Sequence, residues 1–301
     1  MRKILIFMYN LNFNLMKTTR VLLFGYLIFT SLIGFAQPKE TVENWKGKRI
    51  LLIGAHPDDD HQSHGTLAML NKNGNEIYIL TMSTGNVGTK DPNLGKDDLA
   101  KIRRIEQLDA MKQIGLSEDR YINLGYDDGR LEFANKEEAI GKLVYYIRKL
   151  KPDVLMAFDP GYNYQVWHKS DHRAAAYLAA DAVRAAEWPL MYEGHIIQDK
   201  LEAHVIPEFL FYGGNVSDKN TTVDITDFAE QRVNAGSKYV SQWTSGWNNY
   251  LGHDIDKYPT AEKEKLFNNI RKRIKVIDGK SVERFRYHQG APDSMGHAPR
   301  D

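Results

Sequence analysis

Short apolar runs alternate with amphipathic segments along most of the chain after residue 48. A short apolar run bounded by polar residues, Gly or Pro is typical of a buried strand, and a longer segment with apolar residues three or four positions apart is typical of a helix. The predicted strands lie near 49–54, 76–82, 120–124, 153–158 and 208–213, and the predicted helices near 62–73, 96–114, 136–150, 169–186, 226–245 and 260–277. This alternation predicts an α/β fold, a Rossmann-like three-layer α/β/α sandwich with a mostly parallel sheet.

The N-terminal segment follows a different pattern. No acidic residue occurs from Met1 to Lys39, and a basic stretch precedes an apolar run of 16 residues from Val21 to Ala36. Such a run is shorter than the roughly 20 residues of a membrane span and is typical of a secretory signal peptide. We therefore expect residues 1–36 to be a signal peptide cleaved after Ala36, with Met16 as an alternative start. The mature protein would be secreted or periplasmic, without a stable transmembrane anchor.

Composition limits the remaining possibilities. A chain of 301 residues with 42% hydrophobic residues fits one sizeable domain, expected at 48–287, after a polar linker at 37–47 and before a flexible tail at 288–301. The formal net charge is +1, and no basic stripe or known nucleic-acid module is present, so nucleic-acid binding is not predicted. The absence of cysteine excludes disulfides and a lipid-modified cysteine. The sequence leaves the oligomeric state open.

A cluster of ionisable residues follows the first predicted strand. The sequence AHPDDD places His56, Asp58, Asp59 and Asp60 in a loop at the carboxyl end of that strand, where open α/β sheets bind ligands. His56 and Asp59 can turn towards one point and bind a divalent metal, while Asp58 or Asp60 stays free to act on a water molecule. The alternative is an Asp-rich turn that only caps the next helix.

A second cluster, WHKSDHR, precedes the predicted helix at 169–186. His168 and His172 are four residues apart, so they share one helix face if the first turn is helical, and Asp171 lies beside them as a partner for a ring N–H. One or both histidines could complete a metal site. In the alternative interpretation Ser170 or Asp171 is a helix N-cap and His172 is a surface residue.

Together, AHPDDD and the distant DH pair resemble the PIG-L or LmbE-like family of zinc-dependent N-deacetylases. The similarity spans roughly Lys48 to Arg286 and includes supporting segments at 65–70, 103–116, 124–131 and 151–160. It implies an LmbE-like fold and a hydrolase that removes the acetyl group from an N-acetylglucosamine-type sugar carried by a small molecule or glycan.

Position by position, the resemblance implies that His56, Asp59 and His172 bind Zn²⁺, with Fe²⁺ or Co²⁺ as alternatives. Asp58 would be the general base, taking a proton from the attacking water. His168 would lie near the developing oxyanion, or act as an acid for the departing amine.

Further residues have implied supporting roles. Asp171 would orient a neighbouring imidazole, and Arg103 and Asp128 match positions that the family uses around the sugar. Tyr164 belongs to an aromatic loop that is expected to face the pocket. Three positions depart from the family pattern: Asp60 replaces a glutamate, HxxDH replaces HxDH, and Tyr239 stands where a histidine is common, where it could bind substrate or simply pack.

Several interpretations remain open from the residues alone. His61 and His64 share a helix face, but a three-ligand site needs no more, so we expect them to line the pocket or the surface. The loop at 83–96 is rich in Gly, Asn and Thr and could form a wall of the site or a mobile lid. The alternatives to deacetylation are hydrolysis of another sugar-linked amide, a Mg²⁺-dependent phosphohydrolase with an aspartate nucleophile, and a non-catalytic carbohydrate-binding protein.

Overall fold

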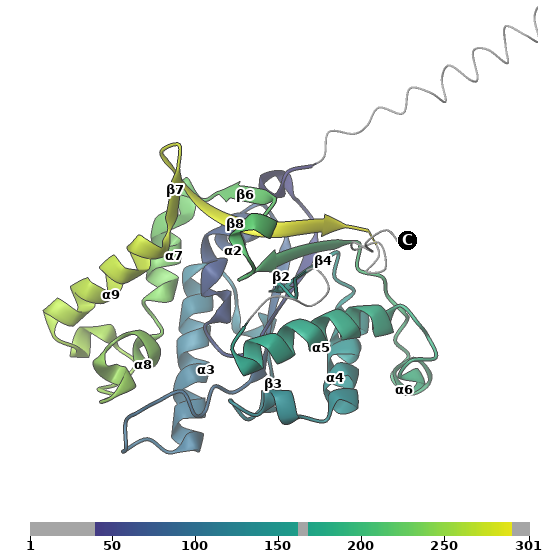
Figure 1. The fold of residues 1–301 in the computed structure, drawn as a ribbon, viewed down its shortest axis with the longest axis horizontal. Coiled ribbons are helices and arrows are strands. Elements are labelled where there is room, and N and C mark those ends of the chain that lie inside the picture. The colour runs from purple at the N-terminus through teal and green to yellow at the C-terminus, as the bar shows by residue number, and fades with distance from the viewer. Residues whose placement is uncertain (1–39, 162–167, 291–301) are drawn as a thin grey trace, which may run out of the picture. The chain divides into compact units, whose positions relative to one another are not determined.

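A single sheet organises the part of the chain that the computed structural model describes, residues 40–161 and 168–290. In these residues eight strands occur, in the order β3-β2-β1-β4-β5-β8-β6, with β7 paired to β8 (Figure 1). Their bounds are β1 Arg49–Gly54, β2 Glu76–Ser83, β3 Tyr121–Tyr126, β4 Val154–Phe158, β5 Glu208–Tyr212, β6 Thr221–Asp224, β7 Lys275–Ile277 and β8 Lys280–Gln289.

The parallel half of the sheet matches the sequence prediction. β1 pairs in parallel with β2 and β4, and β3 and β5 continue the parallel order on either side. All five residues of β4 and of β5 are buried. β4 is apolar throughout and β5 is apolar after Glu208, and such strands are expected where helices cover both faces of a sheet. The parallel strands bring their carboxyl ends to one edge, where the loops after β1 and β4 meet.

Helices cover both faces of this sheet, as predicted. α4 packs on α5, and α5 contacts β1 and β4, whereas α2 and α3 pack with α7 on the other side of the molecule (Figure 1). The helix bounds are α2 His64–Lys72, α3 Lys96–Gln113, α4 Lys136–Leu150, α5 Ser170–Ala186, α6 Glu193–Ile197, α7 Ala229–Gly236, α8 Val240–Trp243 and α9 Thr260–Arg273. Short 3₁₀ helices are η1 Val42–Asn44, η2 Asp59–Gln62, η3 Glu118–Arg120, η4 Leu131–Phe133, η6 Val216–Asp218, η7 Thr226–Phe228, η8 Ser245–Trp247 and η9 Ile255–Lys257.

The C-terminal quarter differs from the prediction. The helix expected at 226–245 is broken into η7, α7 and α8, and the helix expected at 260–277 ends at Arg273 and is followed by β7. β8 runs antiparallel to β5, β6 and β7. The sequence prediction missed β6, β7 and β8, which form this antiparallel side of the sheet. Because β8 extends to Gln289, the first two residues of the expected tail belong to the sheet; residues 291–301 lie outside the described part.

The segment before β1 also needs a correction. Trp45 is 0% exposed and Val42 is 3% exposed, and both belong to the main hydrophobic core. The indole of Trp45 packs against the ring of Tyr287 on β8, with their centroids 6.0 Å apart. The predicted polar linker at 37–47 is therefore wrong for these residues, because they bury apolar surface against the sheet. The predicted signal peptide lies outside the described residues.

Buried ion pairs fasten β8 to the rest of the domain. Arg286 pairs with Asp159, at the end of β4, and both side chains are almost fully buried. Glu283 accepts hydrogen bonds from Arg232, at 2.7 Å, and from the backbone N–H groups of Gly65 and Thr66 at the start of α2, at 3.1 and 2.8 Å. A carboxylate at this end of a helix satisfies free N–H groups and complements the helix dipole.

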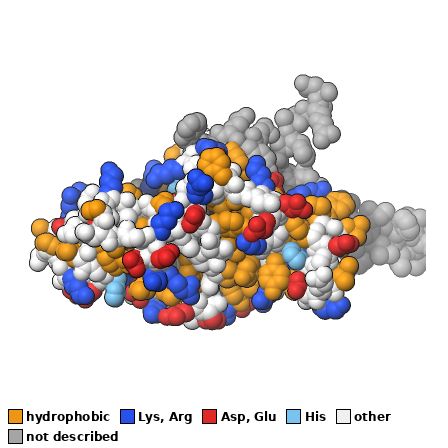
Figure 2. All heavy atoms as spheres, turned by 90° about the horizontal axis from the view of Figure 1, so that it is seen from below, with side chains coloured by type: hydrophobic (Ala, Val, Ile, Leu, Met, Phe, Trp, Pro, Cys, Tyr) orange, Lys and Arg blue, Asp and Glu red, His pale blue; other side chains and the backbone are white. Residues whose placement is uncertain are grey.

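Charge on one face of the molecule is mixed. Figure 2 shows basic and acidic side chains interspersed over the face that it presents, with apolar side chains between them. Such a face gives no sign of a strongly charged partner. Among the described residues no helix has both the length and the apolar character needed to cross a membrane.

Candidate active site

The turn after β1 is fixed by one carboxylate. The backbone N–H groups of Ala55 and His56 both donate to Asp59 Oδ2, at 2.7 Å each. Gly54 allows this approach, because a Cβ there would lie 3.0 Å from the Asp59 Cβ. Asp59 is 3% exposed, so its carboxylate is held at the strand end beside the His56 ring.

Two imidazoles and one carboxylate meet at this edge of the sheet. His172 comes from the first turn of α5, and its Nε2 lies 3.2 Å from Asp59 Oδ1, while His56 Nδ1 lies 3.8 Å from Asp59 Oδ2. One ligand atom from each of the three residues lies within 4.8 Å of the other two. Phe158 stacks on His172 with ring centroids 4.4 Å apart and restrains the ring. This group could hold a metal ion, and the donor set is that of a catalytic site with three protein ligands.

The charges in this group are arranged to stabilise a cation. Burial opposes ionisation of Asp59, but the charge and hydrogen bond of His172 and the proximity of His56 outweigh it and hold the pKa of Asp59 well below its usual range. Burial likewise opposes charge on His56, yet its hydrogen bonds to Asp128 and Asp171 and the charge of Asp59 raise the pKa of His56 to about 10. The carboxylates therefore stabilise positive charge at this point.

A second possible metal-binding group shares His56. Its Nε2 lies 2.9 Å from Asp128 Oδ1 and 3.3 Å from Asp171 Oδ2. Both oxygens of Asp171 already accept backbone hydrogen bonds, from Gly129 at 2.7 Å and from Leu131 at 3.2 Å. A carboxylate held in this way suits the orientation of an imidazole better than direct binding of a metal. The geometry therefore favours the group with Asp59 and His172 as the metal site.

Asp58 lies next to this group but outside it, in a strained conformation. Its φ of 108° is rare for any residue except glycine, and such strain is concentrated at functional sites. Its backbone N–H donates to Gln107 Oε1 at 3.0 Å, and its carboxylate lies 3.2 Å from Arg103 Nη2. Burial dominates over the nearby Arg103 charge and raises the pKa of Asp58 to about 6. A carboxylate with this pKa can accept a proton near neutral pH.

Arg103 supports the Asp58 turn from inside the protein. It is 2% exposed, and its guanidinium donates to the carbonyl oxygen of Pro57 as well as contacting Asp58. Gly85 and Gly88 allow the loop after β2 to pass over it, since a Cβ would lie 3.1 Å from Cζ and 3.2 Å from Nη1, respectively. In the structure Arg103 therefore contacts the turn that carries Pro57 and Asp58. Its expected contact with a sugar stays a prediction.

A buried network behind the turn was only partly visible in the sequence. Asp60 lies 3.1 Å from His64 Nε2 and accepts hydrogen bonds from Gln107, at 2.9 Å, and from the Tyr239 hydroxyl, at 2.9 Å. Tyr239 is 0% exposed, so it packs inside the protein and does not face a ligand. His61 points elsewhere, donating from Nδ1 to the Asp58 carbonyl at 2.7 Å. Gln107 was missed because nothing in the local pattern of its helix marks it.

His168 is not brought into the group. Its Nε2–H donates to the Asp159 carbonyl at 2.8 Å, its ring packs edge-on against Phe158, and it is 8% exposed. Burial lowers the pKa of His168, which favours the neutral ring and disfavours the expected role as an acid. The extra residue in HxxDH explains the difference, because it leaves His168 before the start of α5. Tyr164 lies outside the described residues.

The loop at 83–96 is tied down along its length. The Asn86 amide donates to Asp127 at 2.7 Å, and Gln242 donates to the Gly88 carbonyl at 2.8 Å. Asp91 accepts from the Tyr250 backbone at 2.7 Å. These contacts favour the wall over the mobile lid.

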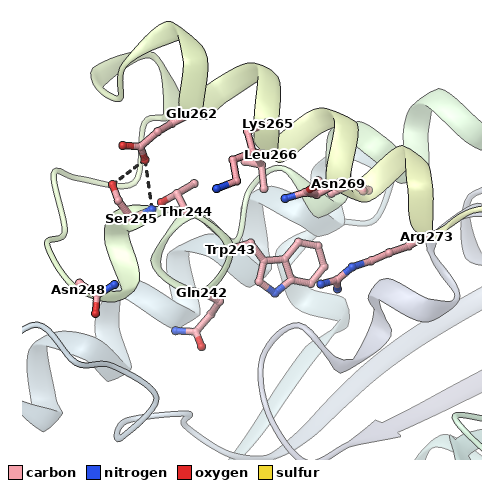
Figure 3. Close-up of a pocket in the computed structure, with 11 residues that line it drawn as sticks. Gln242, Trp243, Thr244, Ser245, Asn248, Glu262, Lys265, Leu266, Asn269 and Arg273 are labelled. Atoms are coloured by element: carbon pink, nitrogen blue, oxygen red, sulfur yellow. Dashed lines mark hydrogen bonds between the residues drawn. The ribbon is translucent and has the colours of Figure 1, made fainter.

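Two hollows are bordered by Arg273, the last residue of α9. The larger, of about 550 Å³, is lined by Trp243, amide side chains and the charged residues of α9, and Figure 3 shows Arg273 reaching from α9 towards the Trp243 ring. The guanidinium of Arg273 lies 4.9 Å from the centroid of that ring. The second, of about 240 Å³, is lined by His61, Tyr212 and several basic residues. His61, whose ring also contacts Trp243 edge-on at 4.8 Å, links both hollows to the Asp58 turn.

Comparisons with known proteins agree with the fold. Residues 51–183 match the family model PIG-L: GlcNAc-PI de-N-acetylase. The chain is 30% identical over 209 residues to diacetylchitobiose deacetylase of Thermococcus kodakarensis. The alignment covers 68% of this chain and 75% of the relative. It is 32% identical over 162 residues, 45% of this chain and 50% of the relative, to 1D-myo-inositol 2-acetamido-2-deoxy-alpha-D-glucopyranoside deacetylase of Streptomyces scabiei. The solved structure of N,N'-diacetylchitobiose deacetylase from Pyrococcus horikoshii superposes with a TM-score of 0.66 at 25% identity, covering 84% of this chain and 87% of that chain. The chain therefore belongs to the PIG-L (GlcNAc-PI de-N-acetylase) family.

Proposed function

We propose that this protein is a metal-dependent hydrolase that removes the acetyl group from an N-acetylglucosamine-type sugar. The observation that carries the proposal is the convergence of His56, Asp59 and His172 at the sheet edge, with the Asp58 carboxylate beside them and free of the group. Family membership supports the reaction type, and the two named relatives act on acetylated amino sugars.

The donor set fits zinc, with Fe²⁺ or Co²⁺ as alternatives. Two imidazoles and one ionised carboxylate leave a fourth position for water or substrate. A divalent metal bound there supplies Lewis acidity, lowering the pKa of water and polarising the acetamide carbonyl. Asp171 holds the His56 ring through Nε2, so that Nδ1 faces Asp59.

Asp58 is the proposed general base. It accepts a proton from the attacking water as the new C–O bond forms, and this proton then passes to the amine nitrogen as the C–N bond breaks, which leaves acetate and a free amino sugar. Arg103 is a positioning residue in this scheme, because it holds both the Asp58 carboxylate and the preceding carbonyl. Asp128, partly exposed beside His56, is the described acidic side chain best placed to contact the sugar.

We also propose that the protein is exported, with residues 1–36 removed as a signal peptide and a mature enzyme that is secreted or periplasmic. The basic start, the short apolar run and the small residues before Gln37 support this. Sequencing the N-terminus of the exported protein tests it. A mature chain that retains Val21–Phe35 would indicate a membrane anchor instead.

The direct test of the function is acetate release. The purified mature chain is incubated with N-acetylglucosamine, diacetylchitobiose and an N-acetylglucosaminyl inositol, with and without a chelator, and the metal content is measured by elemental analysis. The expected result is acetate from at least one member, lost with the chelator and restored by zinc.

The alternatives give different results in the same experiment. No acetate from any sugar with metal demonstrably bound would contradict the proposal and favour another amide or a binding role. With a sugar phosphate added to the panel, phosphate release that survives His172→Ala would favour the Mg²⁺-dependent phosphohydrolase, because such sites rarely depend on imidazole.

A further inference from the structure

A groove with an aromatic lining lies against α4 and α6, which are neighbours in Figure 1. Its volume of about 580 Å³ is within the range of small-molecule pockets. Asn123 and Leu124 border it from β3, the edge strand that ends shortly before Asp128. The proposed metal ligands are not among its described lining residues, so the groove is a feature separate from the candidate active site.

Four rings, those of Tyr192, His195, Tyr145 and Tyr146, follow one another along the groove. The Tyr192 and His195 rings are nearly parallel, with centroids 5.8 Å apart. The Tyr145 ring meets His195 edge-on at 5.6 Å and Tyr146 edge-on at 5.3 Å. All four side chains are partly exposed, and ring faces of this kind bind the apolar face of a sugar or an organic cation.

Tyr192 is held in this series of rings in a strained conformation. Its φ of 53° is uncommon for a residue other than glycine. Gly141 on α4 makes room for the ring, because a Cβ there would lie 2.9 Å from Tyr192 Cε1. The Tyr192 hydroxyl donates to the Glu137 carbonyl at 2.9 Å, and the Tyr192 carbonyl accepts from Arg148 at 3.1 Å. Backbone strain persists where surrounding contacts fix it in this way, and it is concentrated at functional sites.

The groove carries an excess of negative charge. Its charged lining residues are the carboxylates of Glu137, Glu138 and Asp199 and the ammonium of Lys142. Lys142 pairs with Glu138 at 2.6 Å, whereas in the described part of the chain Glu137 and Asp199 form no ion pair.

Both of these carboxylates act on the rings. Burial, and then the charge of Glu137, raise the pKa of the Tyr192 hydroxyl. Burial lowers the pKa of His195, and the charge of Asp199 opposes this effect. Glu137 and Asp199 are therefore placed to pair with a cationic ligand that lies on the rings.

The proposed reaction yields a ligand with the matching chemistry. Each acetyl group removed leaves an amine that takes up a proton, so the product carries an ammonium group on a sugar ring with an apolar face. The rings of the groove attract such groups, since the Lys149 ammonium at its border already lies 5.4 Å from the Tyr145 centroid. The acetylated sugar has no charge to pair with the carboxylates, and an acidic ligand would be repelled by them.

We propose that this groove binds a glucosamine unit of the deacetylated product, with the sugar ring against the tyrosines and the ammonium group paired with Glu137 or Asp199. The inference rests on the proposed function. Such a site would keep the enzyme on a glycan chain that it has already partly deacetylated. The bound unit would raise the local concentration of the acetylated units that remain on the same chain.

Calorimetry tests the groove without relying on turnover. A glucosamine tetramer and an N-acetylglucosamine tetramer of the same linkage are titrated into zinc-loaded mature protein that carries Asp58→Asn, so that the acetylated tetramer is not consumed. The glucosamine tetramer should bind about tenfold more tightly, the effect of two exposed ion pairs. Glu137→Gln and Asp199→Asn should each weaken its binding about two- to fivefold, and Tyr145→Leu about fivefold.

The matched control is Glu193→Gln, which removes the same charge from an exposed position on α6 that does not line the groove. It should bind both tetramers as the parent protein does. Equal binding of the two tetramers, or glucosamine binding that is unchanged in the groove variants, would overturn the proposal. Loss of glucosamine binding in His172→Ala would place the product at the proposed metal site and overturn it as well. Urea unfolding of each variant confirms that it is folded.

Acetate release separates this inference from the proposed function. With Asp58 intact, the double variant of Glu137→Gln and Asp199→Asn should lower kcat/KM about tenfold on a half-deacetylated glycan. It should leave kcat/KM for N-acetylglucosamine unchanged. An unchanged kcat/KM on the glycan would overturn the groove and leave deacetylation intact. If the glucosamine tetramer binds and is lost in the variants but no sugar releases acetate, the proposed function fails and the amino-sugar groove stands.

Discussion

The hydrogen bonds of Asp171 allow the effect of a one-atom change to be worked out. In Asp171→Asn one carboxylate oxygen becomes an NH₂ group. At present Oδ2 accepts from Gly129 at 2.7 Å and lies 3.3 Å from His56 Nε2, and Oδ1 accepts from Leu131 at 3.2 Å. Of the two orientations of the side-chain amide in this variant, the better one keeps the amide oxygen at the Oδ2 position, which has two partners. The new NH₂ group then faces the Leu131 N–H, and only this backbone N–H loses its acceptor.

Two consequences follow for Asp171→Asn. One buried N–H without an acceptor costs about 1–3 kcal/mol of unfolding free energy. The neutral amide is also a weaker partner for His56 than a carboxylate, and loss of such an orienting group typically weakens metal binding about 10- to 100-fold, or about 1.4–2.7 kcal/mol. Zinc affinity is measured by competition with a chromophoric chelator, and stability by urea unfolding of the metal-free protein. Asp181→Asn, on the exposed side of the same helix, is the matched control.

Two results would refute the reasoning about Asp171. Zinc affinity within twofold of the wild type would show that Asp171 does not orient His56. Complete loss of zinc would show that Asp171 is itself a ligand, and the alternative group of His56, Asp128 and Asp171 would then be the metal site.

Three further predictions concern the reaction and the stability of the fold. Asp58→Asn should retain zinc and lose turnover by about two to four orders of magnitude, whereas His172→Ala should lose both zinc and turnover. The zinc content is measured by elemental analysis. Equal zinc loss in the two variants would contradict the role of Asp58 as a base. Arg148 donates to five backbone carbonyls at and after the end of α5. Arg148→Met should therefore lower the free energy of unfolding, measured in urea, by about 3–5 kcal/mol. The control Lys149→Met should change it little. Burial raises the pKa of Glu106 to about 7, although the Arg103 charge and the hydrogen bonds from Ser241 act to lower it. The folded state therefore holds the proton of the Glu106 carboxyl group more tightly than the unfolded chain does. Stability should therefore fall progressively as pH rises from 4.5 towards 7, by about 3 kcal/mol, and unfolding curves of Glu106→Gln should lack this slope.

The strands and helices of the parallel half were predictable because each carries its own signal. β4 is apolar along its whole length, β1 is apolar after Arg49, and α4 and α5 have clear helical periodicity. Their bounds therefore agree with the prediction within one or two residues. β8 was missed for a physical reason. It buries Glu283 and Arg286, and these charges are acceptable only because Arg232 and Asp159 lie opposite them.

The candidate site shows the same division between local and distant information. The proximity of His56, Asp59 and His172 was predictable from two motifs at the ends of two parallel strands. The contacts of Asp60 with Gln107 and Tyr239 were not, because those residues come from elements 47 and 179 positions further along the chain. Local patterns mark which residues carry the chemistry, but the residues that hold them in place are marked only by three-dimensional packing.

The contacts of β8 with the start of α2 and with Asp159 have a consequence for biosynthesis. The first turn of α2 contains the N–H groups of Gly65 and Thr66, which are capped by Glu283. A nascent chain that has not yet released β8 from the ribosome leaves those groups without their acceptor and leaves Asp159 without its arginine. The proposed metal site, whose ligands all precede β8 in the chain, thus reaches its final geometry only after β8 has been synthesised. Premature termination between codons 172 and 283 should yield a chain that binds the metal poorly, even though every proposed ligand has been made.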